Sequence, residues 1–532
     1  MSKIGETPLD MGLKDAIIGI FIWNKEKGIF EPFENRLRKK ARALLEYYTD
    51  LANDELKPYV ISKTIIDNVV DEIKDKTLIP LPNEPLRVAF PNCTLEWKIS
   101  HGRYVPSFVL AEERTPEHFA FHYIPHKIHL EELVKINEEV LSARDIPIDL
   151  IEDLARRLCP KSLEVFKQWA NEKWVTLFEI IGYTLFPKIE FRKAFMILGP
   201  RGTGKSTFIN LIKKLLGRGN VVNIPLHILF GDKNRFVLAE LYHKLVNAVS
   251  ETKEYNLDDM DTLKVLTGGD RITADVKFKD PITFTPYAKL VIASNKPPTI
   301  RDKNDMAFWH RWLIIEFPNQ FEDNTAWGDK TFTEDELEGI LTVSILAFSR
   351  VLLHGKFDFE QTEEEVRGIW LSTIDYVYKF VKEKLKHGEI MITKNADDYV
   401  RVKELYRMYL EYCSTNGYNA TTYKGFVRRL RDYFNLTVVM KNVEGKRFRA
   451  VVGIKINTVQ TNETTGGDYG EFLNYILKNN HMIKEFADLV RDFGSTEKAN
   501  VFIDFCTKKN MCFSRGIDAW EISIQPRGFS FL

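Results

Sequence analysis

Nine consecutive residues have the types and the spacing of a phosphate-binding loop. The run from Gly199 to Thr207 reads GPRGTGKST and fits the pattern G-x-x-x-x-G-K-[ST]. Glycines let backbone N–H groups turn toward phosphate oxygens, the lysine reaches the β- and γ-phosphates, and the hydroxyl ligates Mg²⁺. A strand-like run, 193–198, precedes the loop, and a helical run, 208–216, follows it. The sequence therefore predicts a site for ATP and Mg²⁺ made of Gly199, Pro200, Arg201, Gly202, Thr203, Gly204, Lys205, Ser206 and Thr207.

Hydrolysis of ATP also requires a carboxylate at the end of a neighbouring strand, and Glu251 is the candidate. The strand-like run 245–249 (LVNAV) is followed by Ser250 and Glu251. Many such NTPases carry two adjacent acids at this point, whereas this chain has Ser250 in the first position. We expect Ser206 and Glu251 to hold the metal ion, the alternative being that Glu251 is a solvated residue at a strand end.

Two more groups stand at strand boundaries. Asn295 follows the strand-like run 289–293 (KLVIA) and can orient the attacking water by hydrogen bonding, although asparagine is also a common turn former. Arg311 precedes the run 312–317 (WLIIEF) and can reach a phosphate in a neighbouring subunit as an arginine finger. A surface salt bridge is the alternative for Arg311, and Arg301 competes for the finger role.

The composition limits the class of protein. The 532 residues suggest three or four domains, and 44% hydrophobic with 28% charged residues is ordinary globular composition. Seventy-five basic and 75 acidic residues balance to zero net charge, which excludes a chain-wide basic coat but allows a local basic surface. Five cysteines without a C-x-x-C pair favour a reducing, intracellular setting. We expect no membrane span and no signal peptide, because the longest apolar stretch, 339–349, is well short of about 18 residues.

Patterns along the chain indicate how the elements are arranged. Strand-like and helical runs alternate over 191–320, which is typical of an α/β domain. Residues 1–160 mix short strands and helices, including a strand at 17–23 and a helix at 34–48. Helices are expected over 160–190 and 330–390, and helices followed by two strands over 395–457.

The order of these motifs resembles the superfamily-three helicases, an AAA+ branch, and more narrowly the phage, plasmid and poxvirus primase-helicases. The segment 263–274 (LKVLTGGDRITA), the helix residues 179–183 (EIIGY) and the C-terminal residues 402–406 (VKELY) carry the resemblance. It covers about residues 15–455 and implies an α/β fold with an AAA+ P-loop NTPase core, an α+β N-terminal domain and a C-terminal winged helix. The expected domains are 1–160 (N-terminal), 161–390 (helicase), 395–457 (winged helix), 458–469 (linker) and 470–532 (a module without assigned role).

The segment 271–286 is a candidate DNA-binding hairpin. Apolar and polar residues alternate up to Lys279, and Asp280-Pro281 can make the turn before the chain returns. The resemblance implies that such a hairpin points into the channel of the ring and grips DNA phosphates. We expect Lys277 and Lys279 to do so, with Phe278 stacking on a base, the alternative being an ordinary solvated hairpin.

The stretch 424–455 is strongly basic, with nine basic residues against two acidic ones. The expected recognition helix is 421–434 and the expected wing is 440–452. Tyr423, Phe426 and Phe448 lie among the bases, a pattern that suits contact with a duplex backbone. A solvated basic face or a protein contact is the alternative. The candidate DNA-binding residues here are Arg428, Arg429, Lys446 and Arg447.

Two other patterns are weaker. His122, His126 and His129 have helix-like spacing, but Pro125 lies among them and no cysteine or acid cluster joins them, so a metal site is disfavoured. Asp259-Met-Asp261 is the nearest match to a primase D-x-D motif, but it lies in a polar stretch inside the NTPase region. We therefore predict no primase active site in this sequence.

The combined hypothesis is an ATP-dependent DNA helicase, assembled as a hexamer, that moves 3′→5′ in the replication of a virus, phage or plasmid. Its partners would be single-stranded and forked DNA, further copies of itself, and a separate primase or polymerase. Two alternatives stay open. One is a packaging or loading motor that does not unwind DNA, and the other is a DNA-binding initiator that ATP switches between conformations.

Overall fold

The computed structural model forms two compact units, Met1–Lys379 and Phe380–Leu532. It describes residues 21–32, 86–140, 145–231, 235–251, 256–257, 260–277, 280–300, 305–321, 327–393, 397–443 and 445–457, with short pieces at 39, 42–43, 64, 66–68, 395, 483–485, 512–514 and 519–522. Most of the helix expected over 34–48 and the linker at 458–469 lie outside the described residues. Each unit is considered by itself.

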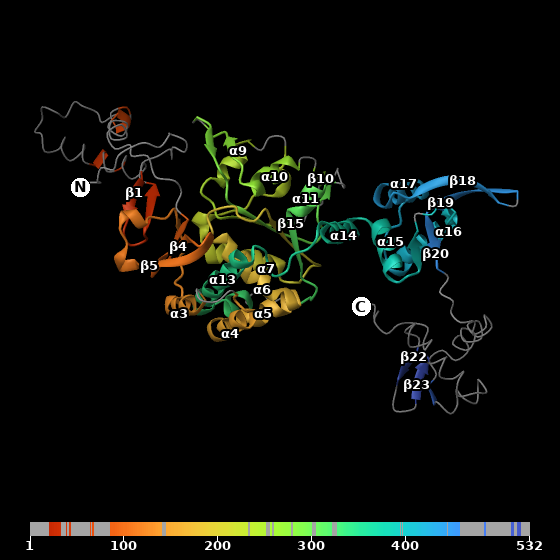
Figure 1. The fold of residues 1–532 in the computed structure, drawn as a ribbon, viewed down its shortest axis with the longest axis horizontal. Coiled ribbons are helices and arrows are strands. Elements are labelled where there is room, and N and C mark those ends of the chain that lie inside the picture. Colours follow the sequence, from red (N-terminus) through yellow and green to blue (C-terminus); the bar gives the residue numbers. More distant parts are fainter. Residues whose placement is uncertain are drawn as a thin grey trace, which may run out of the picture. The chain divides into compact units, whose positions relative to one another are not determined.

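A five-stranded parallel sheet forms the centre of the first unit (Figure 1). Its strand order is β15 (Trp312–Glu316), β7 (Ala194–Leu198), β13 (Lys289–Ser294), β9 (Val246–Glu251) and β8 (Val221–Val222). The strands expected at 193–198, 245–249, 289–293 and 312–317 are therefore confirmed within about two residues at either end. All five residues of β7 are buried, as continuous apolar runs in a parallel sheet must be when both faces are covered.

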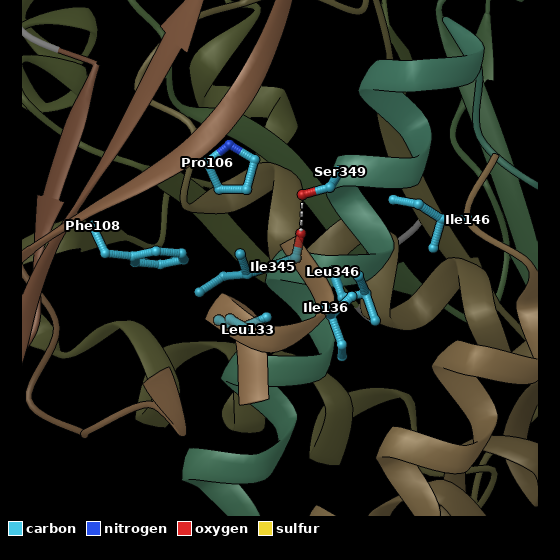
Figure 2. A pocket seen from close by; sticks show the side chains of 8 residues that line it. All are labelled: Pro106, Phe108, Leu133, Ile136, Ile146, Ile345, Leu346 and Ser349. Carbon is cyan, nitrogen blue, oxygen red and sulfur yellow. Dashed lines mark hydrogen bonds between the residues drawn. The ribbon is translucent and has the colours of Figure 1, made fainter. Parts of the chain in front are cut away.

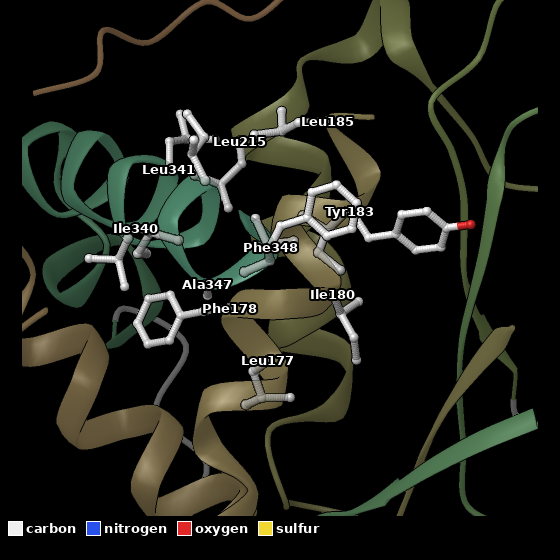
Figure 3. Packing of buried hydrophobic residues seen from close by; sticks show 14 of the residues in the cluster. Leu177, Phe178, Ile180, Tyr183, Leu185, Leu215, Ile340, Leu341, Ala347 and Phe348 are labelled. Carbon is white, nitrogen blue, oxygen red and sulfur yellow. The ribbon is translucent and has the colours of Figure 1, made fainter. Parts of the chain in front are cut away.

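Helix α13 (Glu334–His354) is the central helix of a bundle that packs beside this sheet. Figure 1 shows α4 (Ile148–Leu158), α5 (Pro160–Ala170) and α6 (Trp174–Thr184) gathered near it. Figure 3 shows Phe348 and Ile340 of α13 among Tyr183, Ile180 and Phe178 of α6. The rings of Tyr183 and Phe348 stack with centroids 5.4 Å apart. Three acids in the first turn, a histidine in the last and Gly355 beyond it at φ +72° give α13 a well-defined start and end.

Two glycines let α13 approach its neighbours at backbone distance. A Cβ added to Gly182 of α6 would lie 2.1 Å from the carbonyl oxygen of Ser344 in α13. A Cβ added to Gly339 of α13 would lie 2.3 Å from the carbonyl oxygen of Leu158, which ends α4. No side chain fits at either place, so these glycines set how closely the helices pack.

The length and apolar composition of α13 would suffice to cross a membrane. However, 67% of its most apolar window is buried inside the protein, and its neighbours are α4, α5 and α6. Its hydropathy is therefore explained by its place at the centre of the core.

The N-terminal strands belong to the same core as the parallel sheet. The second sheet of the unit has the order β5 (Arg103–Leu110), β4 (Cys93–Ser100), β3 (Arg87–Ala89) and β6 (His122–Tyr123). Trp97 of β4 meets Phe348 of α13 edge to face, with ring centroids 5.3 Å apart. One hydrophobic cluster therefore contains residues from both sides of position 160, where the N-terminal domain is expected to end. Farther toward the N-terminus, β1 (Phe21–Asn24) pairs with β2 (Ile29–Pro32), so β1 overlaps the end of the strand expected at 17–23.

The second unit begins in α15 (Tyr376–Lys386), a helix that starts before the boundary and continues into the unit. Helices α16 (Val402–Thr415) and α17 (Tyr423–Phe434) pack through an aromatic cluster in which Phe426 and Tyr409 stack with centroids 5.0 Å apart. A three-stranded antiparallel sheet accompanies them, in the order β17 (Tyr399–Arg401), β19 (Lys446–Val452) and β18 (Thr437–Val443). Strands β16 (Ile390–Ile392) and β20 (Ile454–Ile456) pair separately. A third sheet contains β21 (Ile483–Glu485), β23 (Ala519–Ile522) and β22 (Cys512–Ser514).

Candidate functional site

The loop after β7 has the backbone conformation that its glycines permit. Gly202 and Gly204 have φ of +75° and +86°, a region that residues with a Cβ avoid. A Cβ on Gly199 would lie 2.4 Å from the carbonyl oxygen of Phe317. Helix α7 (Lys205–Leu216) begins directly after Gly204, so its unpaired N–H groups face the loop. The strand, loop and helix expected from the sequence are present in that order.

The segment after β15 holds the outer side of this loop. The N–H of Phe321 donates to the carbonyl oxygen of Gly202 at 2.7 Å, and the side-chain amide of Gln320 donates to the carbonyl oxygen of Arg201 at 3.1 Å. These bonds engage two carbonyls of the loop from outside. They leave the N–H groups of the loop to turn inward, as a phosphate site requires.

Trp169 of α5 supports the loop from the helical bundle. Its indole lies so close to Gly204 that an added Cβ would be 2.1 Å from Nε1. The same ring stacks on Phe317 with centroids 5.5 Å apart and meets Phe208 of α7 edge to face at 6.1 Å. Trp169 and Gln320 are not among the predicted site residues, because both lie far from the motif in sequence. For Trp169 the sequence predicts only a position within the helices expected over 160–190.

Lys205 is buried and its ammonium lies within the loop. Nζ donates to the carbonyl oxygen of Pro200 and to the hydroxyl of Thr203 at 3.3 Å. Burial lowers the pKa of Lys205 below its ordinary value, and no carboxylate among the described side chains offsets that effect. An anion of high charge bound in the loop would supply this compensation. Ser206, beside it, is exposed at the start of α7.

Three strand ends bring the candidate catalytic residues to one edge of the sheet. In the strand register, Ser294 of β13 is paired with Leu198 of β7 on one side and with Glu251 of β9 on the other. Asn295 comes directly after Ser294 and is half-buried, next to the start of the loop. The N–H of Gly199 donates to the carbonyl oxygen of Ser294 at 3.4 Å, which ties the two strand ends together.

Glu251 ends β9 at the same edge, and its backbone position is what the structure describes of it. Because β13 separates β9 from β7, the Cα of Glu251 lies about 10 Å from that of Leu198 at normal strand spacing. The role of Glu251 as a metal ligand therefore stays a prediction. The glycines of the loop, the buried Lys205 and the exposed Ser206 fit the phosphates of a nucleoside triphosphate with its Mg²⁺.

Arg311 lies at the opposite end of the strands from the loop, where the parallel strands begin. It precedes β15, whose first residue, Trp312, is paired with Ala194, the first residue of β7. The length of β7 puts about 16 Å between Arg311 and the loop of its own chain. Its Nη1 donates to the carbonyl oxygen of Ala307 at 2.6 Å, whereas Nε is buried and has no hydrogen-bond partner among the described residues. Burial, followed by the nearby charge of Arg192, lowers the pKa of Arg311. The competing residue, Arg301, lies outside the described residues.

The expected hairpin is present with shorter strands than the sequence indicated. Strand β11 (Ile272–Ala274) pairs with β12 (Ile282–Phe284), and the hydroxyls of Thr273 and Thr283 lie 3.0 Å apart. The expectation that the strand continues to Lys279 is wrong, because Asp275 leaves the pairing. Its N–H donates to the carbonyl oxygen of Arg235 at 3.1 Å, and its carboxylate lies 3.3 Å from the guanidinium of Arg235. Lys277 is exposed in the connecting loop, and Phe278 and Lys279 lie outside the described residues.

The basic C-terminal residues divide between two elements. Arg428 is exposed on α17, and Arg429 donates from Nη1 to the hydroxyl of Thr421 at 2.5 Å. Lys446 and Arg447 are exposed at the start of β19. The prediction that Phe426 contributes to contact with a duplex is wrong, because Phe426 is fully buried in the helical core and cannot contact a nucleic acid.

The clustered histidines have separate partners. His122 is completely buried, with Nδ1 2.8 Å from Oδ1 of Asn220 and Nε2 2.8 Å from the hydroxyl of Tyr287. Burial lowers the pKa of His122 to about 3. His126 bonds the carboxylate of Glu334 at 2.6 Å. Among the described residues no group of three or more potential ligands could hold a metal ion.

A small pocket elsewhere in the first unit has no features of a phosphate or nucleotide site. Figure 2 shows Pro106, Phe108, Leu133, Ile136, Ile146, Ile345 and Leu346 lining it with Ser349. The one hydroxyl in this lining belongs to Ser349 and donates to the carbonyl oxygen of Ile345 in its own helix at 2.8 Å. The pocket is an apolar packing gap between β5, α3 (Leu130–Val140) and α13.

The fold and the site define the class as a mixed α/β protein whose phosphate-loop motif lies at the carboxyl edge of a parallel sheet. Residues 12–175 match the family described as "D5 N terminal like", and residues 372–465 match "Poxvirus D5 protein-like". Residues 197–311, which contain the loop, match a "Family of unknown function (DUF5906)". The N-terminal and C-terminal parts of the chain are therefore similar to D5-like proteins, and the segment that contains the loop is similar to a family without an assigned function.

One curated relative is the "Putative helicase L207/L206" of Acanthamoeba polyphaga mimivirus, which is 26% identical over 186 residues. The match covers 30% of this chain and only 19% of that relative. Among solved structures, the apo C-terminal region of NrS-1 matches with 15% identity and a TM-score of 0.35, covering 74% of this chain and 90% of that one. A JCV helicase bound to a small organic compound matches with 15% identity and a TM-score of 0.22, covering 49% and 75%. Both TM-scores are too low to support a structural argument.

Proposed function

We propose that this chain is an ATP-dependent DNA helicase that works as a hexameric ring in the replication of a virus, phage or plasmid. The observation that carries the proposal is the arrangement of the sheet. The loop, Asn295 and Glu251 share one edge, whereas Arg311 lies at the other edge. A complete catalytic site would then require the Arg311 of a neighbouring subunit, and a closed ring supplies one neighbour for every site.

The roles of the residues follow from their positions. Lys205 and the N–H groups of the loop would bind the β- and γ-phosphates, Glu251 would polarise the attacking water, and Asn295 would orient it. Mg²⁺, held by Ser206 and Glu251, would neutralise charge on the phosphates. Arg311 from the next subunit would stabilise the charge that develops as the phosphate leaves. The assignment of the core as an AAA+ domain rests on these roles and on the strand order β15-β7-β13-β9-β8.

DNA would be held by two elements. Lys277, with Phe278 and Lys279, would grip a single strand in the channel and move with each hydrolysis step in the 3′→5′ direction. Helices α16 and α17 and the β18–β19 hairpin occur in the order expected of a winged helix, and this supports contact of Arg428, Arg429, Lys446 and Arg447 with the duplex backbone. The protein would work inside the cell with a separate primase or polymerase.

A fork-unwinding assay with ATP and Mg²⁺ tests the proposal. The wild-type protein should separate a forked duplex, and Lys205→Ala should abolish both unwinding and ATP hydrolysis while leaving the melting temperature within about 2 °C. ATPase activity that single-stranded DNA stimulates, without unwinding of any fork, would instead identify a packaging or loading motor. Nucleotide-dependent DNA binding without turnover would identify an ATP-switched initiator.

A further inference from the structure

One face of the three-stranded sheet in the second unit carries two aromatic rings, each beside a basic side chain. Side chains alternate between the two faces along each strand. Val400 and Val451 are buried on one face, and the guanidinium of Arg449, on that face too, lies 5.9 Å from the ring centre of Tyr423 in α17. The opposite face carries Tyr399, Arg401, Lys441 and Phe448, which we call the aromatic face.

The two rings of the aromatic face lie side by side on neighbouring strands. The centroids of Tyr399 and Phe448 are 6.1 Å apart and their planes differ by 34°. The guanidinium of Arg401 lies 4.5 Å from the centre of the Phe448 ring, and the ammonium of Lys441 lies 4.2 Å from the centre of the Tyr399 ring. Both rings are half-buried, so each presents part of its surface to solvent beside a cation.

The surroundings of these rings are basic and partly apolar. Arg401 and Lys446 are exposed on the same face, and Val439 and Val443 of β18 are 36% and 37% exposed there. Ala450, between Arg401 and Val439 in the strand register, is small and fully buried. The stretch 424–455 carries seven more basic than acidic residues, so a polyanion is favoured as a partner.

We propose that the aromatic face binds single-stranded DNA, with two bases stacked on Tyr399 and Phe448 and the phosphates contacted by Arg401 and Lys441. This inference rests on the proposed function, to which it adds a second single-strand site outside the channel hairpin. Sheets that bind single strands use aromatic rings in this way, because every base has a π-face.

The chemistry favours a single strand over a duplex. In a duplex the bases stack on one another inside the helix, so their faces are not available to protein rings, whereas an unpaired strand can turn its bases outward. The stack of a base on a ring is stronger than the exposed cation–π contact that it replaces. When a base displaces Arg401 or Lys441 from its ring, the cation remains close enough to pair with a phosphate of the same strand.

Binding of a fluorescein-labelled oligo-dT to the full chain, without nucleotide and in a Lys277→Ala background, tests this proposal. The background variant weakens the channel hairpin, so that the second site dominates the anisotropy signal. We expect Tyr399→Leu combined with Phe448→Leu to weaken binding at least tenfold. A separate variant, Tyr399→Phe combined with Phe448→Tyr, keeps an aromatic ring at both positions and should bind as tightly as the background. Tyr418→Leu is the matched control, since Tyr418 is a half-buried tyrosine of the same unit that lies outside the sheet, and it should bind as the background does.

Three further measurements make the test independent of folding. Ultraviolet cross-linking to oligo-bromodeoxyuridine, followed by mass spectrometry of the peptides, should place adducts on Tyr399 or Phe448. The combined variant Arg401→Ala/Lys441→Ala, which keeps both rings, should reduce the slope of log affinity against log salt by about 1.4. Circular dichroism melting should show the same transition for all variants.

Several results would overturn the inference. These are unchanged affinity in the double leucine variant, cross-links confined to other residues, preference for oligo-rU over oligo-dT, or association of a second copy through this face in place of DNA. Fork unwinding by the same preparations separates the two proposals. Unwinding without binding at the aromatic face removes only this inference, whereas oligo-dT binding at the face without unwinding removes only the proposed helicase function.

Discussion

At the scale of single residues, the phosphate loop depends on a contact that comes from outside the nucleotide-binding motif. Gly204 has a backbone conformation that favours glycine, and the indole of Trp169 fills the space where a side chain would project. The last glycine of the motif is therefore required twice, once for its φ angle and once for the close approach of a helix. This links the conformation of the loop to the packing of the bundle.

Replacing Gly204 by alanine should impair both stability and activity. The positive φ and the contact with Trp169 should together lower the free energy of unfolding by about 2–4 kcal/mol. ATP hydrolysis should fall below one hundredth of wild type, since the N–H groups of the loop lose their orientation. Urea unfolding and a steady-state ATPase assay measure the two effects.

Gly219→Ala is the matched control for that experiment. Gly219 is exposed three residues after α7 ends at Leu216, and an added Cβ there meets nothing within 4 Å. This variant should unfold and hydrolyse ATP as the wild type does. If Gly204→Ala unfolds with the same midpoint as Gly219→Ala, the close approach of Trp169 is wrong.

The buried His122 should make stability depend on pH. Burial holds its pKa near 3 in the folded state, well below the value of about 6.5 of an unfolded chain, so the unfolded state binds the extra proton. The stabilisation is fully present above pH 6.5 and is lost as the pH falls from 6.5 toward 3. Denaturant midpoints measured between pH 7.5 and 4.5 should therefore decrease as the pH is lowered.

A variant without the titrating imidazole isolates this contribution. His122→Gln should be less stable at pH 7.5, because the bonds to Asn220 and Tyr287 change, but its midpoint should vary less with pH. His227→Gln, at an exposed position of α8 (Leu226–Leu229), should keep the wild-type pH dependence. Equal pH slopes for all three proteins would exclude His122 as the source.

At the scale of elements, the contact between α6 and α13 sets the geometry of the bundle. Gly182→Ala would push a methyl group against the carbonyl oxygen of Ser344 and the Cβ of Phe348. Overpacking of this kind should lower the free energy of unfolding by about 1–3 kcal/mol. Gly368→Ala in α14 (Glu363–Ile374), where space is available, should instead raise it by up to about 1 kcal/mol through helix propensity. Calorimetric melting of the two variants should move in opposite directions.

The hairpin β11–β12 should couple DNA to hydrolysis without belonging to the catalytic site. Lys277→Ala combined with Lys279→Ala should keep the basal ATPase rate and lose most of its stimulation by single-stranded DNA, together with unwinding. Lys330→Ala, an exposed lysine at the end of α12 (Trp327–Thr331), serves as the control for a lost surface charge. Full DNA stimulation in the double variant would contradict a role for the hairpin in gripping DNA.

The sequence was sufficient where structure is local and insufficient where it depends on distant pairings. The strand, loop and helix around Lys205 follow one another along the chain, so a single motif predicts them. The order of the strands was not predictable, because β13 lies between β7 and β9 through contacts more than 40 residues apart. The same limit hid Trp169 and Gln320, which contact the loop from separate elements. The roles of Glu251, Asn295 and Arg311 stay predictions.

Phe426 shows a different error. It was grouped with surface aromatics because basic residues surround it in sequence. Phe426, Leu430 and Tyr433 recur at the spacing of one helix face, and all three are buried. Helical periodicity, applied before local charge, would have assigned Phe426 to the core.

At the scale of the whole molecule, the separation of Arg311 from the loop predicts sites that are shared between subunits. Lys205→Ala and Arg311→Ala should each abolish ATP hydrolysis when pure. Mixing them in equal amounts should restore on the order of a quarter of the sites, because some loops with an intact Lys205 then meet an intact Arg311 in a neighbour. ATPase rates measured across mixing ratios test this expectation. No recovery at any ratio, in proteins that exchange subunits, would place the finger elsewhere.

The position of α13 also has a consequence for synthesis of the chain. The helix at the centre of the core is encoded after its partners α4, α5 and α6 and after all five strands of the parallel sheet. A ribosome must therefore extrude more than 350 residues before the core can close, and until then the apolar faces of the earlier helices stay open to solvent. Nascent chains halted before residue 334 should bind chaperones and resist compaction. Chains that also include all of α13 should fold compactly and dissociate from the chaperones.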